Sequence, residues 1–229
     1  MTARSVRRLY SLLYRHFGPQ HWWPADSAWE MMVGAILTQN TSWANVEKAI
    51  TALKQSRNLS LRAVARMPRR RLEKLIRPTG YFRQKAERLQ WFARALLNDR
   101  EFYRILCDRA ASRPPLHSLR DRLLSLHGIG PETADSILLY AAGYPIFVVD
   151  AYTCRIGQRM GLFKTNDYDE VQRYFHENCR GGRLAARKCQ YNEFHALIVR
   201  LAKEVCTKHD PHCSICPLKP DCAYARGRK

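Results

Sequence analysis

Two glycines separated by a single residue, Gly128 and Gly130, constrain this chain more than any other feature of its sequence. The stretch before them, about residues 116 to 125, is predicted to be helical. Pro131 follows directly, and proline is favoured in the first turn of a helix because the N–H that it lacks has no partner there. Glycine lets the backbone turn sharply between two helices. The sequence therefore predicts a helix, a tight hairpin and a second helix.

The hairpin offers a binding place for an anion. Because glycines carry no side chain, the amides of residues 128–133 can approach a ligand at the positive end of the second helix. Lys and Arg number 39 against 20 Asp and Glu, a formal net charge of +19 that is spread along the chain. Such a surplus favours a polyanion as partner, so the expected anion is a nucleic-acid phosphate. For the two glycines alone, a simple tight turn is an equally good interpretation.

The rest of the chain has apolar side chains at helical spacing, and no segment alternates as a strand does. A hydrophobic content of 46% predicts a folded protein, and no apolar run is long enough to span a membrane. Ser27, Ser42, Asp150 and Asp167 are expected to cap helices. The expected helices cover about 1–17, 27–38, 42–53, 60–66, 69–76, 82–96, 151–160, 167–175 and 190–205.

Four cysteines near the C-terminus, Cys206, Cys213, Cys216 and Cys222, have the spacing C-x6-C-x2-C-x5-C. Four thiolates in so short a stretch repel one another and oxidise unless a metal centre holds them. The spacing alone fits a zinc site as well as a [4Fe-4S] cluster. The residues therefore predict a metal centre and leave its identity open.

Two of these motifs occur together in a known family. Residues 126–134 read L-H-G-I-G-P-E-T-A, and Asp150 follows. This resembles the motif of the endonuclease III superfamily of DNA glycosylases, L-x-G-x-G-x-x-T-A followed by an Asp roughly fifteen residues later. The cysteine spacing is similar to the C-terminal iron-sulfur loop of the same superfamily. The resemblance extends over nearly the whole chain.

The resemblance implies an all-α, two-lobed helix-hairpin-helix DNA glycosylase fold with a C-terminal [4Fe-4S] cluster loop. One lobe, residues 23–141, would be a six-helix barrel that contains the hairpin. The other would join residues 1–22 to 142–229 and carry the cluster loop, 206–222, with the four cysteines as ligands. The hairpin and Asp150 would face a cleft between the lobes. We expect a monomer in the cytoplasm, nucleoid-associated in a prokaryote, that acts on double-stranded DNA with a flipped damaged base.

Asp150 is the expected catalytic residue. Cleavage of an N-glycosidic bond builds positive charge on the sugar, which a nearby carboxylate stabilises, and helix capping is the alternative role. A monovalent cation is expected at the hairpin. The residues expected to contact DNA are Gln39, Asn40, Gly128, Ile129, Gly130, Thr133 and Lys208, with Gln39 filling the space that the flipped base leaves.

Glu132 departs from the pattern of those family members that also cut the strand. They carry a lysine two residues after the second hairpin glycine, and its neutral amine attacks C1′ to form a Schiff base. A carboxylate cannot do this. The sequence therefore predicts a monofunctional glycosylase that uses water and leaves an abasic site, with Lys164 as the nearest lysine that could substitute.

The substrate is predicted from aromatic residues. Trp22, Trp23, Pro24 and Trp43, together with Glu132, resemble the base pocket of the 3-methyladenine glycosylase branch. N-alkylated purines are cationic and stack well on indoles. For each tryptophan alone, a place in the core is the commoner role. The alternatives are a glycosylase for mismatched or oxidised bases, a non-catalytic damage-binding protein on the same scaffold, and a zinc-held adaptor.

Overall fold

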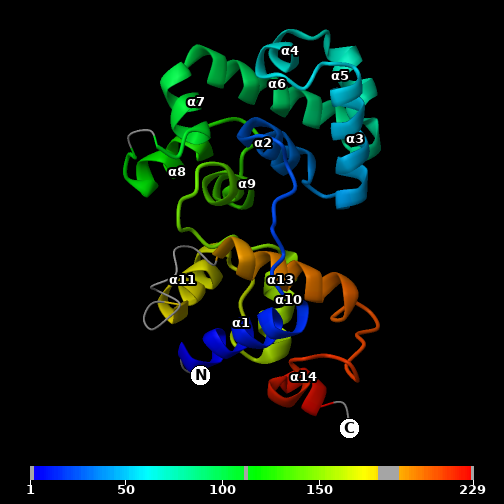
Figure 1. Cartoon of the computed structure of the whole chain (residues 1–229), viewed down its shortest axis with the longest axis vertical. Helices are drawn as coiled ribbons and strands as arrows, with labels where there is room; N and C mark the ends of the chain where they lie inside the picture. The colour runs from blue at the N-terminus through cyan, green and yellow to red at the C-terminus, as the bar shows by residue number, and fades with distance from the viewer. Residues whose placement is uncertain (1–2, 111–112, 180–190, 228–229) are drawn as a thin grey trace. The chain divides into compact units, whose positions relative to one another are not determined.

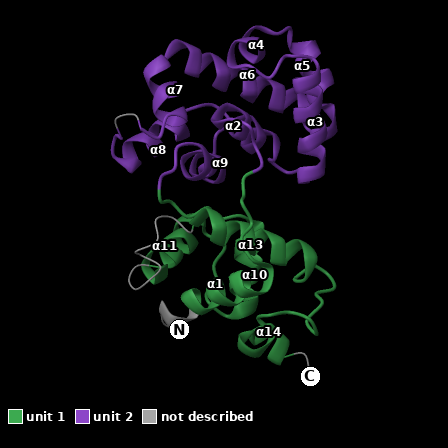
Figure 2. Ribbon diagram, in the orientation of Figure 1, with its two compact units in different colours: residues 1–23, 145–229 green, residues 24–144 purple. Residues whose placement is uncertain are grey.

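The computed structural model describes residues 3–110, 113–179 and 191–227, and every regular element in these ranges is helical. The prediction of an all-α fold is therefore confirmed (Figure 1). The chain divides into two compact units, which Figure 2 colours separately. Unit 1 comprises Met1–Trp23 and Pro145–Lys229, and unit 2 comprises Pro24–Tyr144.

Unit 1 is built on helices from both ends of the chain. Its core centres on Phe147, whose ring stacks on that of Phe175 at 4.1 Å and meets the ring of Phe194 edge-on. Val6, Leu9 and Leu13 of the first helix join this core, as their spacing predicts. The elements are α1 (Ala3–Phe17), α10 (Ala151–Met160), α11 (Tyr168–Cys179), α13 (Tyr191–Glu204), η3 (Lys219–Asp221) and α14 (Ala223–Arg226).

Unit 2 surrounds a helix that is buried almost throughout. The residues of α2 (Ala28–Leu37) from Trp29 to Leu37 are all buried, and all of them except Glu30 are apolar. It packs against α6, α9 and η2. The other elements are α3 (Trp43–Gln55), α4 (Leu61–Arg66), α5 (Arg69–Ile76), η1 (Arg77–Thr79), α6 (Phe82–Asn98), α7 (Arg100–Cys107), α8 (Leu116–Leu124), α9 (Pro131–Ser136) and the π-helical turn η2 (Ile137–Ala141).

Three of the four expected helix caps are confirmed. Ser27 Oγ accepts from the amide of Glu30, Asp150 Oδ1 from that of Thr153, and Asp167 Oδ1 from that of Glu170. The prediction for Ser42 is wrong in its detail. Ser42 occupies the N-cap position of α3 without a side-chain cap, because the amide of Asn45 bonds to its backbone carbonyl instead.

A buried lysine ties the end of α2 to its neighbours. Lys85 of α6 is 1% exposed, and its Nζ donates to the carbonyls of Leu37 (2.9 Å) and Thr79 (2.7 Å). Burial, with a smaller contribution from the charge of Arg88, lowers the pKa of Lys85 to about 8. Both carbonyls lie at helix ends, where no intrahelical partner is available. Lys85 therefore holds the C-terminal end of α2 in place, and the segment that follows α2 begins there.

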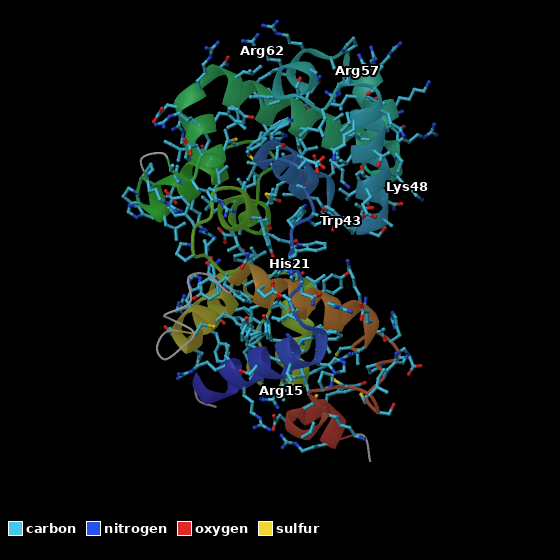
Figure 3. All side chains as sticks on the ribbon, in the orientation of Figure 1. Arg15, His21, Trp43, Lys48, Arg57 and Arg62 are labelled. Atoms are coloured by element: carbon cyan, nitrogen blue, oxygen red, sulfur yellow. The ribbon has the colours of Figure 1, made fainter. Side chains whose placement is uncertain are left out.

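Basic side chains project from both units. The labelled Arg57, Arg62 and Lys48 point outward from unit 2, and Arg15 from unit 1 (Figure 3). All four are exposed, as the spread of charge along the sequence predicts. Within the described ranges, no helix is both long enough and apolar enough to cross a membrane.

Candidate functional site

The hairpin between α8 and α9 needs glycine at one of its two glycine positions. Gly128 has φ +80°, and a Cβ placed on it would lie 2.3 Å from Cγ of Arg88. Gly130 is the N-cap of α9 with φ −93°, and a Cβ there would meet nothing within 4 Å. Ile129 between them is buried, whereas Gly130 is exposed. The turn therefore depends on Gly128, and the smallness of Gly130 leaves the start of α9 open to a ligand.

Gln39, just beyond the end of α2, holds the hairpin in place. Its Nε2 donates to the carbonyl of Gly128 (3.1 Å) and to Oγ1 of Thr133 (3.0 Å). Arg88 donates to its Oε1 (2.7 Å) and so fixes the orientation of the amide. The structure thus brings together three of the predicted DNA-contact residues, and insertion of Gln39 into DNA stays a prediction. Arg88 was not predicted, because nothing in its local sequence marks it.

An ion pair joins the two helices of the hairpin motif. Asp135 of α9 is fully buried, and Arg120 of α8 donates to both of its carboxylate oxygens, at 2.8 and 3.3 Å. A bidentate pair of this kind fixes direction as well as distance. Sequence reasoning missed this pair too, although an Asp and an Arg on the two predicted helices were a possible signal.

Asp150 in unit 1 is a mostly buried carboxylate whose pKa is lowered. It caps α10, and its Oδ2 lies 3.4 Å from Nε2 of His195 on α13. Burial by itself raises the pKa of the Asp150 carboxyl, but the hydrogen bond and field of His195 and the amide of Thr153 outweigh it. The pKa is therefore held below its usual value. Capping and a chemical role are compatible, since Oδ1 bonds Thr153 and Oδ2 faces His195.

The predicted base-pocket residues are distributed over both units. In unit 1 the rings of Trp22 and Trp23 lie 5.5 Å apart, and both residues are partly buried. In unit 2 Trp43 begins α3 and donates to Glu47 (2.7 Å), outside the buried stripe of that helix. Pro24 and Glu132 are exposed, and Glu132 lies in the first turn of α9. Trp43 is therefore not a core residue of its helix.

The four C-terminal cysteines line one pocket of unit 1, together with Arg159, Lys219 and Tyr224. Burial raises the pKa of the Cys216 thiol, and the charges of the other three sulfurs raise it further. Arg159 donates to Sγ of Cys206 (3.1 Å), which suits a thiolate. Lys208 is exposed on the same loop, and its carbonyl accepts from Arg159.

Four cysteine thiols are a donor set that suits a [4Fe-4S] cluster or a single zinc ion. Within the described residues, no three ligating side chains meet as the ligands of one metal ion. In a [4Fe-4S] cluster each of four cysteines binds a different iron, so the sulfurs stand apart around a shared centre. Four cysteine sulfurs that line one pocket are compatible with that arrangement.

The two hairpin glycines allow a matched test of the turn. We expect Gly128→Ala to destabilise the protein by roughly 1–3 kcal/mol, because φ is positive and Arg88 occupies the space of the new Cβ. Gly130→Ala should change stability by no more than about 0.5 kcal/mol. Urea denaturation of both variants measures the difference, and equal stabilities would contradict this account of the hairpin.

Comparison with known proteins agrees with this architecture. Over 218 residues the chain is 41% identical to a protein of Methanocaldococcus jannaschii that is named as a candidate DNA repair glycosylase, covering 95% of each chain. It is 27% identical to a thymine/uracil-DNA glycosylase of Pyrobaculum aerophilum, covering 94% of this chain and 90% of the relative.

Two solved structures have the same fold. A 3-methyladenine DNA glycosylase of H. pylori bound to 1,N6-ethenoadenine matches with a TM-score of 0.72 and 27% identity, covering 89% of this chain and 98% of the other. A non-covalent complex of endonuclease III with DNA matches with a TM-score of 0.82 and 22% identity, covering 100% and 98%. Residues 33–181 match the model of the HhH-GPD superfamily base excision DNA repair protein. The chain therefore belongs to the HhH-GPD superfamily and is a DNA repair glycosylase of that type.

Proposed function

We propose that this protein hydrolyses the N-glycosidic bond of N-alkylated purines, of which 3-methyladenine is the type, in double-stranded DNA. The product is an abasic site in an uncut strand. The observation that carries the proposal is Asp150, a carboxylate that is mostly buried and yet held ionised by His195 and Thr153. Burial of a charged group lowers the stability of a protein, and a catalytic role would explain why this one is buried.

Asp150 would act on the charge that develops during the reaction. As the bond to the base breaks, the sugar becomes positively charged, and an ionised carboxylate in a poorly solvated place stabilises that charge strongly. The same carboxylate can orient the water that adds to C1′. His195 would not touch the substrate. It would position Asp150 and keep it ionised.

Glu132 supports a reaction without a covalent intermediate. It occupies the position where strand-cutting members of the family carry their lysine, and an ionised carboxylate offers no lone pair that forms a Schiff base. Lys164, the lysine that could take the place of the missing amine nucleophile, is exposed in the segment after α10. Water would therefore be the nucleophile, and the enzyme would lack lyase activity.

The aromatic residues support an alkylated purine as substrate. An N-alkylated purine carries positive charge, which favours contact with indole faces. Trp22, Trp23, Pro24 and Trp43 are the residues proposed for that contact. Glu132 would balance that charge. The relative of known structure that is 27% identical is named a 3-methyladenine glycosylase and holds a modified adenine. Because alkylation already weakens the bond, stabilisation by one carboxylate is sufficient chemistry.

DNA would be held through its phosphates. The amides at the start of α9, from Gly128 to Thr133, would bind one strand, with a monovalent cation at the hairpin, and exposed Lys208 would contact another phosphate. Asn40, exposed beside Gln39, would lie at the lesion. The protein would act as a monomer, and its charge of +19 would give the affinity a steep dependence on salt.

Cys206, Cys213, Cys216 and Cys222 would hold a [4Fe-4S] cluster. When bound, the cluster would link the end of α13 to the loop that follows and so stabilise a segment with little apolar core of its own. The proposed removal of the base does not use the cluster.

A second candidate is a glycosylase for mismatched thymine or uracil, because a relative with that name is 27% identical over almost the whole chain. The two candidates share Asp150 and the hairpin and differ in the base that the pocket accepts.

Excision from a panel of duplexes tests the proposal. We expect release of 3-methyladenine or 7-methylguanine by the wild-type protein, and a loss of about a hundredfold or more for Asp150→Asn. Asn caps helices as well as Asp does, so this variant should keep its fold and its affinity for DNA. Release of thymine or uracil alone would establish the second candidate, and undiminished excision by Asp150→Asn would remove the proposed mechanism.

Borohydride trapping tests the absence of an amine nucleophile. Incubation of the wild-type protein with lesion DNA and borohydride should give no covalent adduct, because Glu132 cannot form a reducible imine. Glu132→Lys places an amine at that position and serves as the positive comparison. An adduct with the wild-type protein that disappears in Lys164→Ala would show that a different lysine does this chemistry.

The pH profile of single-turnover excision tests the role of His195. The pKa of Asp150 is lowered in the folded protein, so its carboxylate persists as pH falls and activity is lost only below that pKa. In His195→Leu burial acts without this compensation, so the pKa rises and the acidic limb moves to higher pH. His195→Gln retains a donor and should give an intermediate profile. Identical acidic limbs in all three proteins would assign His195 a purely structural role.

A further inference from the structure

We propose that Trp91 extends the DNA interface beyond the hairpin, by packing its indole against the deoxyribose rings of the strand whose phosphates the hairpin binds. This inference rests on the proposed role of the hairpin as the phosphate-binding element. Trp91 has no part in the base pocket or in the reaction.

Trp91 is a large apolar side chain left in solvent by a well-packed helix. It lies inside α6 and is 57% exposed, although its neighbours Phe92 and Ala93 are almost completely buried. Exposure therefore does not result from a loose helix end. Leaving an indole in water forgoes the stabilisation that its burial would give, which makes an exposed tryptophan a feature that calls for a partner.

The position of Trp91 relates it to the hairpin. Its ring lies 6.5 Å from that of His127, centroid to centroid, and His127 directly precedes Gly128. Arg88, one turn earlier on the same face of α6, lies against Gly128 and holds Gln39. The face of α6 that supports the hairpin thus continues into an exposed indole, with the exposed imidazole of His127 beside it.

The chemistry of this surface fits the backbone of DNA. Amides at the start of α9 favour a phosphate as ligand. The indole of Trp91 favours an apolar group that lies one or two nucleotides from that phosphate. The sugar–phosphate backbone presents both in alternation. The faces of the bases in a duplex are stacked on one another and cannot pack against this indole unless a base leaves the helix. The deoxyribose rings alternate with the phosphates along the same strand, so they are the occupant.

Substitution of Trp91 should weaken binding of duplex DNA without changing its dependence on salt. We expect Trp91→Ala to raise Kd by about five- to tenfold, as removal of an aromatic anchor does at an interface. The slope of log Kd against log salt should not change, since an indole contact releases no counterion. Trp91→Phe should recover most of the affinity.

Tyr81→Ala is the matched control. Tyr81 is 68% exposed and precedes the same helix, about 15 Å along its axis from Trp91. Its removal should leave Kd unchanged.

Three results would overturn the inference: an unchanged Kd for Trp91→Ala, a changed salt slope, or a loss confined to DNA with an unpaired nucleotide, which would mean stacking on a base. If the wild-type protein excises bases while Trp91→Ala binds DNA normally, only this inference fails. If Trp91 affects binding while the wild-type protein releases no base, only the proposed function fails.

Discussion

The hairpin of this protein depends on two cationic side chains of one helix. Lys85 and Arg88 lie one turn apart on α6, where the first fixes the carbonyl end of α2 and the second orients Gln39 against the hairpin. Among the residues that the structure describes, neither cation has a carboxylate as a hydrogen-bond partner there. Each side chain donates to neutral oxygens. Its positive charge strengthens these hydrogen bonds in a place with little water. Gly128 is required because the stem of Arg88 occupies the space of its side chain.

Hydrogen-bond donors in a poorly solvated place also determine the pKa of Asp150. A carboxylate placed in a poorly solvated site tends to take up a proton, and this one avoids it through Thr153 and His195. The helix cap supplies one of those partners at no extra cost, because the first amides of a helix need an acceptor in any case. Asp150 directly follows the buried residues 146–149, and it is thereby both the N-cap of α10 and a carboxylate whose pKa is lowered.

Local signals determined how much could be predicted. Serine, proline and glycine at helix ends allowed α4, α5 and α10 to be placed to within one or two residues, and Gly161 takes the left-handed conformation that ends α10. The short helix α7 was missed although Asp99 caps it. Arg88 and His195 could not be predicted, because each acts on a residue 45 or 49 positions away and only the folded chain brings them together.

Glu132 is the residue of the hairpin motif on which the proposed hydrolytic reaction depends. It lies in the first turn of α9, where the partial positive charge of the helix stabilises an anion and disfavours a cation. A lysine at this position would have its pKa lowered and would be a better nucleophile as a neutral amine. A glutamate at this position has no amine and so cannot form a Schiff base with the sugar, which agrees with the hydrolytic reaction proposed above. Because Glu132 is exposed, neither residue would disturb the packing that Gln39, Arg88 and Gly128 provide, so the structure of the hairpin would accommodate either one.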